Sequence, residues 1–352
     1  MTNRWQRAVL GATRVPAMNK LTEATDSIQK LLADVLPGQA MKLPAGLMRS
    51  KSAPASHREP PPGTPGGPAA IGRFVPLTYR DSAGEHRYKL FIPDQMPAAP
   101  PLVVMLHGCT QSPDDFAAGT RMNELAGRQG CLVAYPEQTS SANAQRCWNW
   151  FRTGDQQRGV GEPALVAGIA GEVMREYGVD PRRVYVAGLS AGGAAAAVLA
   201  EAYPDLFAAV GVHSGLACGA AHDMASAFMA MHAGHVGSAG GVGKRPNVPV
   251  VVFHGDRDNT VNPANADSVI AQRTGDGSLQ TETDSGSVPG GRSWTRTRYR
   301  DPKQRVVVER WLVHGEGHAW SGGSSDGSYT DPQGPDASGE MLRFFLEHPK
   351  AG

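Results

Sequence analysis

Short apolar runs alternate along the chain with longer segments of helical periodicity. Runs typical of buried strands lie at residues 102–106, 131–135, 208–212, 248–254 and 306–313, and another begins at residue 183. Helices are expected at 115–128, 164–177 and 341–347, and an early hairpin at 74–79 and 87–92. Strands that alternate with helices predict an α/β fold, in which a mostly parallel central sheet is covered by helices on both faces.

The first 70 residues have a different pattern. Between residues 21 and 35 apolar side chains recur at steps of three and four, and Pro37-Gly38 ends the run, so residues 1–51 are expected to form a basic amphipathic helical extension. Residues 52–70 are rich in proline and glycine and are expected to be a linker. The catalytic domain is then expected to occupy residues 71–352.

Charge is distributed unevenly over these parts. Residues 1–60 hold nine Lys and Arg against four Asp and Glu, whereas all 352 residues together have a net charge of +1. The extension could therefore contact a surface or a polymer granule, although a helix folded onto its own domain or a frayed tail fits the same pattern. The near-neutral total gives no reason to expect a nucleic-acid partner.

The sequence contains no apolar run of about 18 residues and no apolar signal region near its start, so we expect no transmembrane segment and a cytoplasmic location. The four cysteines form neither a disulfide framework nor a C-x-x-C pair. Cys109 and Cys147 lie beside expected site residues, and the spacing leaves open whether they are bonded to each other.

Ser190 has the sequence surroundings of a nucleophile. It lies in Gly188-Leu189-Ser190-Ala191-Gly192, after a β-branched run and before an alanine-rich segment that favours a helix. This strand, sharp turn and helix form the nucleophile elbow, where flanking glycines allow close backbone contact. The same G-x-S-x-G pattern at residues 323–327 has no strand before it or helix after it, and is expected to be a loop.

A nucleophilic serine needs a base and an acid, which on this fold follow it in the order acid, histidine. Asp258 follows the apolar run at 248–254 and is favoured as the acid, because Asp256 is better placed to cap the turn and pair with Arg257. His318 lies in a glycine-framed loop and is favoured as the base over His314, which ends a strand.

The negative charge that develops on the substrate requires two backbone N–H donors. Ala191, directly after the serine, is expected to supply one. Cys109, in the loop after the strand at 102–106, is expected to supply the other through its backbone. We expect no metal and no cofactor.

Five motifs in one order resemble the polyhydroxybutyrate (PHB) depolymerase family of esterases, which is related to feruloyl and acetyl-xylan esterases within the α/β-hydrolase fold. The motifs are His107-Gly-Cys-Thr-Gln111, Tyr135-Pro-Glu-Gln138, Cys147-Trp-Asn-Trp-Phe151, the elbow, and His318-Ala-Trp-Ser-Gly-Gly323. The resemblance implies a triad of Ser190, Asp258 and His318 and ester hydrolysis through an acyl-enzyme. It also raises an extracellular location as the alternative, as for secreted members of the family.

Aromatic and polar side chains within these motifs are candidates for substrate binding. We expect Trp320, Trp148, Trp150 and His107 to line the site, with packing beneath the loops as the alternative for Trp148 and Trp150. The substrates expected are hydroxyalkanoate esters or oligomers. The alternatives are small aryl or acetyl esters of the feruloyl and acetyl-xylan type, and a non-catalytic protein that binds a granule or surface.

Overall fold

The computed structural model describes residues 71–82, 84–234, 248–274 and 279–351. The expected extension at 1–51 and the linker at 52–70 lie outside these described residues.

A mixed ten-stranded sheet organises the described residues, with the strand order β1-β2-β4-β3-β5-β6-β7-β10-β9-β8. Its six central strands are parallel. They are β4 (Leu132–Pro136), β3 (Leu102–Leu106), β5 (Val184–Leu189), β6 (Ala209–His213), β7 (Val250–Gly255) and β10 (Val306–Val313). All six were predicted from their apolar runs, because strands covered on both faces are apolar throughout.

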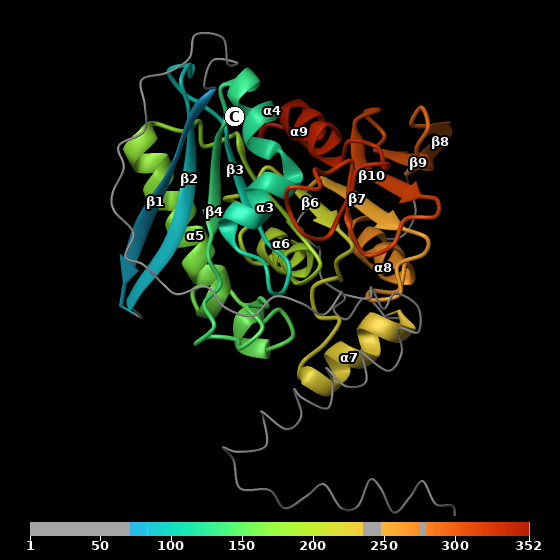
Figure 1. Cartoon of the computed structure of the whole chain (residues 1–352), viewed down its shortest axis with the longest axis horizontal. Coiled ribbons are helices and arrows are strands. Elements are labelled where there is room, and N and C mark those ends of the chain that lie inside the picture. Colours follow the sequence, from blue (N-terminus) through green and yellow to red (C-terminus); the bar gives the residue numbers. More distant parts are fainter. Residues whose placement is uncertain (1–70, 83, 235–247, 275–278, 352) are drawn as a thin grey trace, which may run out of the picture. The chain divides into compact units, whose positions relative to one another are not determined.

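An antiparallel hairpin lies at each side of this parallel region (Figure 1). The first, β1 (Gly72–Asp81) and β2 (Gly84–Pro93), was predicted. The second, β8 (Gln280–Ser287) and β9 (Ser293–Arg300), was not, because β8 is mostly exposed and polar and has no apolar alternation. A two-stranded sheet of β11 (Trp320–Ser321) and β12 (Thr330–Asp331) stands apart.

Helices cover both faces of the large sheet (Figure 1). Those packed into one core are α5 (Gly161–Tyr177), α6 (Ala191–Ala202), α7 (Met224–Ala233) and α8 (Ala264–Thr274). Those packed into the other are α3 (Pro113–Thr120), α4 (Met122–Gln129) and α9 (Ala337–Glu347). This arrangement confirms the predicted α/β fold.

Two local features differ from the sequence prediction. The helix expected at 115–128 is two helices, α3 and α4, because Arg121 between them adopts a left-handed conformation with φ 54°. Helices α7 and α8 were not predicted. None of the helices in the described ranges is long and apolar enough to cross a membrane.

Candidate active site

Ser190 occupies the turn between β5 and α6. Its φ is 58° and its ψ is −120°, a backbone conformation that costs energy for any residue with a side chain. Its N–H donates a hydrogen bond to the carbonyl of His213, 2.9 Å away, on the neighbouring strand β6. The strained turn thus presents Ser190 at the carboxyl edge of the sheet, where ligands of open α/β sheets bind.

The glycines around Ser190 are required by close packing. A Cβ at Gly192 would overlap the carbonyl oxygen of Leu106 and lie 2.6 Å from that of His107. A Cβ at Gly188 would in turn overlap the backbone of Gly192. The first turn of α6 therefore packs directly on the end of β3, as the motif predicted.

Asp258 and His318 form a buried hydrogen-bonded pair. Nδ1 of His318 lies 2.8 Å from Oδ2 of Asp258, and the two side chains are 12% and 0% exposed. The other oxygen, Oδ1, accepts the N–H groups of Thr260 at 2.9 Å and Val261 at 2.8 Å. Because Asp258 holds Nδ1, the nitrogen left for exchange with a serine hydroxyl is Nε2.

A second histidine, His254, also faces Asp258. Its Nε2 lies 3.4 Å from Oδ2 of Asp258 and donates to the carbonyl of Val261 at 2.8 Å. Burial opposes the negative charge of Asp258, but the hydrogen bonds from His254 and His318 outweigh it and hold the pKa of Asp258 far below its usual value. Asp258 is therefore ionised at any pH at which the protein would work.

His213 connects the serine turn to the histidine loop. Its carbonyl accepts from Ser190, and its Nε2 accepts the N–H of Ser321 at 3.0 Å, three residues after His318. The ring stacks between Phe253 and Trp320. Burial lowers the pKa of His213 well below its usual value, so the ring is neutral and its hydrogen lies on Nδ1. The sequence did not single out His213, since a lone histidine at a strand end carries no motif.

The two residues that the sequence set aside bind each other. Oδ2 of Asp256 lies 3.0 Å from Nδ1 of His314, and Oδ1 accepts the N–H of Gly315 at 2.7 Å. This corrects the expectation that Asp256 would pair with Arg257. Nε2 of His314 lies 2.9 Å from the hydroxyl of Thr295, so both ring nitrogens of His314 have partners.

The two expected oxyanion donors lie beside the serine. A Cβ at Gly108, next to Cys109 in the chain, would be 3.7 Å from Cβ of Ser190, so the loop after β3 contacts the elbow. Ala191 is the first residue of α6. Neither Ala191 nor Cys109 donates its N–H to an acceptor within the described ranges. Both groups are therefore available to a substrate oxygen.

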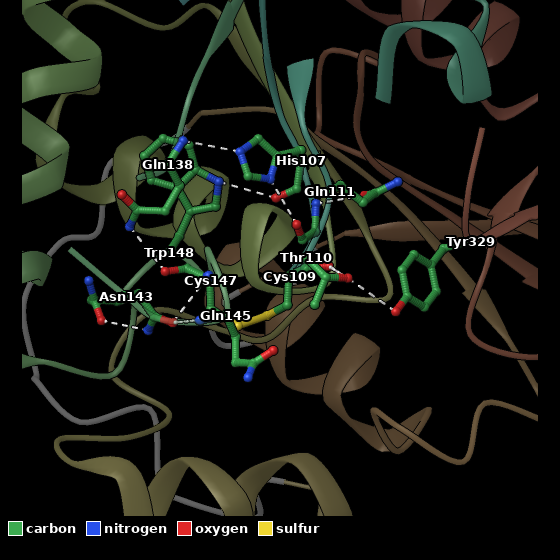
Figure 2. The surroundings of a disulfide bond; sticks show 12 residues. His107, Cys109, Thr110, Gln111, Gln138, Asn143, Gln145, Cys147, Trp148 and Tyr329 are labelled. Carbon is green, nitrogen blue, oxygen red and sulfur yellow. Dashed lines mark hydrogen bonds between the residues drawn. A yellow bond between two sulfur atoms is a disulfide. The ribbon is translucent and has the colours of Figure 1, made fainter. Parts of the chain in front are cut away.

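Cys109 is bonded to Cys147, which answers the question that the spacing left open. The two Cα atoms are 4.2 Å apart, and the bond joins the loop after β3 to the loop before α5 (Figure 2). The other two cysteines, Cys131 and Cys218, lie outside this disulfide.

The four side chains expected to bind substrate lie in the interior. Trp148, Trp320 and His107 are at most 1% exposed and Trp150 is 6% exposed. Nε1 of Trp148 donates to the carbonyl of His107 at 3.1 Å, and Nε1 of Trp320 donates to the hydroxyl of Ser338 at 3.0 Å. For Trp148 and Trp150 this favours the alternative of packing beneath the loops, and for Trp320 and His107 it differs from the expectation.

His107 uses both of its ring nitrogens internally. Nε2 accepts the N–H of Gln138 at 3.1 Å, and Nδ1 donates to the carbonyl of Gly108 at 2.8 Å. Burial lowers the pKa of His107 to about 4. A neutral ring with both nitrogens occupied has no group to offer a substrate, so His107 fixes the loop that carries Cys109.

Two buried carboxyl groups near the site were not expected. Glu162, at the start of α5, accepts hydrogen bonds from Gln138 at 2.5 Å and from both the side chain and the backbone of Asn149 at 2.6 Å. Burial raises the pKa of Glu162 to about 7. Glu316, two residues before His318, is fully buried, and the hydroxyl of Ser321 lies beside its carboxyl group.

Comparison with known proteins shows the family of the chain. The family described as Esterase PHB depolymerase matches residues 87–283, which is more than half of the chain. The chain belongs to the PHB depolymerase family of esterases. This confirms the resemblance that the five motifs indicated.

Relatives of the chain include both a depolymerase and a feruloyl esterase. The chain is 34% identical to a poly(3-hydroxyalkanoate) depolymerase C from Paucimonas lemoignei over 64% of its own length and 56% of the relative's, so it spans about half of that protein. It is 28% identical to a feruloyl esterase B from Thermothelomyces thermophilus over 65% of its length and 82% of the relative's.

A solved structure shows the same fold. The acetyl xylan esterase from Aspergillus awamori superimposes with a TM-score of 0.60 at 20% identity, over 78% of this chain and 99% of that one. With the mostly parallel sheet and the elbow, this similarity shows that this member of the PHB depolymerase family has the α/β-hydrolase fold.

Proposed function

We propose that the chain is a serine esterase that hydrolyses carboxylic esters through an acyl-enzyme. The substrates that we favour are hydroxyalkanoate esters or oligomers. The observation that supports the esterase activity most is the buried Asp258–His318 pair on loops of the same sheet edge as the strained turn of Ser190. A buried carboxylate and a positive φ on a serine are costly to stability, and they are typical of sites selected for chemistry.

Each residue has one role in the proposed reaction. Oγ of Ser190 attacks the ester carbonyl carbon while Nε2 of His318 takes its proton. Asp258 holds His318 in the required tautomer and stabilises the imidazolium. The N–H groups of Cys109 and Ala191 bind the oxygen of the tetrahedral intermediate. His318 returns the proton to the leaving alcohol, and water then repeats the sequence on the acyl group.

The choice of substrate rests on similarity. The 34% identity to a protein named as a poly(3-hydroxyalkanoate) depolymerase supports hydroxyalkanoates, and the match to 82% of a protein named feruloyl esterase B supports aryl esters as the second candidate. Neither comparison addresses the possible contact of residues 1–51 with a granule or surface, which stays a proposal.

The Cys109–Cys147 disulfide is relevant to the location of the protein in or outside the cell. Disulfides persist in oxidising environments and are rare in reducing ones. The Cys109–Cys147 bond therefore supports the extracellular alternative over the cytoplasmic location expected from the sequence.

The proposal is tested by hydrolysis of p-nitrophenyl esters from C2 to C8, a feruloyl ester and a 3-hydroxybutyrate oligomer. We expect the wild type to cleave at least one of these and Ser190→Ala to lose about 10⁴-fold or more in kcat. The ester that is cleaved fastest distinguishes a hydroxyalkanoate esterase from an esterase of the feruloyl or acetyl-xylan type. A wild type as inert as Ser190→Ala on all of them would contradict the proposal and favour the non-catalytic binding protein.

A further inference from the structure

The loop that carries the proposed donor Cys109 is fastened to a second loop, at residues 143–151. Three links join them: the Cys109–Cys147 disulfide, the N–H of Thr110 donating to the carbonyl of Gln145 at 2.6 Å, and Nε1 of Trp148 donating to the carbonyl of His107 (Figure 2). The three links act on His107, Cys109 and Thr110 of the donor loop. Of these, only the disulfide acts through a side chain of the donor residue.

Further hydrogen bonds on either side of Cys109 join residues of the donor loop to one another. The N–H of Gly108 donates to Oε1 of Gln111 at 2.9 Å, and the hydroxyl of Thr110 donates to the carbonyl of Cys109 at 2.6 Å. The carbonyl of Gly108, which belongs to the same peptide unit as the N–H of Cys109, accepts from Nδ1 of His107 at 2.8 Å and from the N–H of Gln111 at 3.3 Å. These bonds orient the peptide unit within the loop, and the disulfide holds Cα of Cys109 against the second loop.

Cys147, at the other end of the disulfide, is held in place by hydrogen bonds. The carbonyl of Cys147 accepts from Nε2 of Gln138 at 3.0 Å (Figure 2). Gln138 and Asn149, on either side, both bind the buried carboxyl of Glu162 at the start of α5. Cys147 is thereby fixed to the body of the domain, so the disulfide transmits that fixed position to Cys109.

We propose that the Cys109–Cys147 disulfide is a positioning bond for catalysis, which aims the N–H of Cys109 at the substrate oxygen, and that breaking it lowers turnover while the fold persists. The inference rests on the proposed function. Donors of an oxyanion hole act only when they are fixed before the reaction, because reorienting a dipole during the reaction costs the energy that it would supply. Cys147, which does not touch the substrate, is a positioning residue.

Reduction breaks the bond by a balanced exchange. A dithiol such as dithiothreitol attacks one sulfur as its thiolate, forms a mixed disulfide and then closes on itself, so the S–S bond gains two electrons and two protons and becomes two thiols. The dithiol is oxidised to its cyclic disulfide. Loss of turnover should follow the appearance of these two thiols.

The test compares the full-length wild type with the double variant Cys109→Ser/Cys147→Ser, which keeps both backbone N–H groups. We expect kcat to fall about 10- to 100-fold, somewhat less than the ~10²–10³-fold that loss of a whole donor costs, with KM within about twofold. Affinity for a boronic acid, whose adduct with Ser190 places an oxygen in the same hole, should fall in parallel. The double variant should also be insensitive to dithiothreitol. Cys218→Ser, outside the disulfide, should match the wild type.

A bond that only stabilises the fold would give another result. The double variant would then melt at a lower temperature but keep its kcat and boronic acid affinity at 25 °C, and the proposal would be overturned. If the double variant does not fold, wild type is reduced with dithiothreitol while kcat and near-ultraviolet circular dichroism are followed together. Loss of kcat before the dichroism changes supports the proposal, and simultaneous loss contradicts it. An oxidised wild type that is inert on every ester would instead refute the proposed function.

Discussion

Asp256 and His314 form a hydrogen-bonded pair that repeats, a few residues upstream, the contact between Asp258 and His318. The separations are alike, 3.0 Å and 2.8 Å, but the side chains of Asp256 and His314 are 34% and 38% exposed, whereas Asp258 is fully buried. An aspartate next to a histidine is therefore not enough to define the proposed triad. Burial and the additional donors to Asp258 separate one pair from the other.

Exchange of each aspartate for asparagine should separate the two pairs in activity. Asp258→Asn should lower kcat by about 10³–10⁴-fold on a soluble p-nitrophenyl ester, because the amide no longer holds the tautomer of His318 that accepts the serine proton. Asp256→Asn, the matched control, should stay within about threefold of the wild type. Equal losses in both variants would show that the pairs act together, and a larger loss in Asp256→Asn would reverse the assignment.

The elbow should tolerate no added methyl group. Gly192→Ala should lower the free energy of unfolding by about 3 kcal/mol or more, because its Cβ would overlap the carbonyl oxygens that end β3. Gly171→Ala, in the middle of α5, where the added Cβ would make only an ordinary contact with Nη1 of Arg175 at 3.7 Å, should stabilise the protein by about 0.5–1 kcal/mol through helix propensity. Chemical denaturation of both variants measures this, and a Gly192→Ala protein of normal stability would show that the packing is looser than described.

Glu316 should make stability depend on pH. Burial raises the pKa of Glu316 to about 8, against the hydroxyl of Ser321 and the guanidinium of Arg292, which lower it. The carboxylates of Asp331 and Asp258 act in the same direction as burial. In the unfolded chain a glutamate titrates near 4.5, so its share of the stability is complete below that pH and is lost as the pH rises through about 8. The wild type should therefore lose a few kcal/mol relative to Glu316→Gln between pH 5 and pH 9.

Urea denaturation of both proteins at several pH values checks this prediction. The amide of Glu316→Gln stays neutral throughout, so the difference in unfolding free energy should shift steadily in favour of the variant as the pH rises. A difference that does not change with pH would show that Glu316 is ionised in the folded protein or open to water.

Trp148 should affect turnover without affecting the choice of substrate. Trp148→Phe keeps an aromatic ring beneath the loop but removes the donor to the carbonyl of His107, a buried hydrogen bond worth about 1–3 kcal/mol when one partner is lost. We expect a lower melting temperature, a modest fall in kcat and an unchanged order of preference among C2 to C8 esters. A changed order of preference would mean that the ring contacts the acyl chain after all.

The sequence predicted the elements that have a strong local pattern. The six parallel strands are apolar throughout, and Ser190 stands between a β-branched run and an alanine-rich helix, so both could be recognised from neighbours in the chain. The hairpin of β8 and β9 could not, because its strands face each other with polar and charged side chains, such as Arg296 and Asp284, and have no apolar alternation.

The sequence predicted those residues of the proposed site that belong to a local motif. Ser190, Asp258 and His318 are each placed by the loop after a buried strand. His213, His254 and Glu162 were missed because what matters about each is a contact with residues distant in sequence, such as His213 with Ser321. For Trp148 the sequence left packing beneath the loop open as the alternative, and for Trp320 it predicted substrate contact, because a motif shows that a ring lies near the site but not which side of the loop it packs on.

The outermost strand β8 has a consequence for behaviour in solution. It is the last strand of the sheet in the described part of the chain, so one row of its backbone groups is open to pairing with a strand of another molecule. Its acidic side chains Glu282 and Asp284, paired with arginines of β9, put charge along that edge. Concentrated salt, which screens these charges, would weaken the barrier to edge-to-edge aggregation.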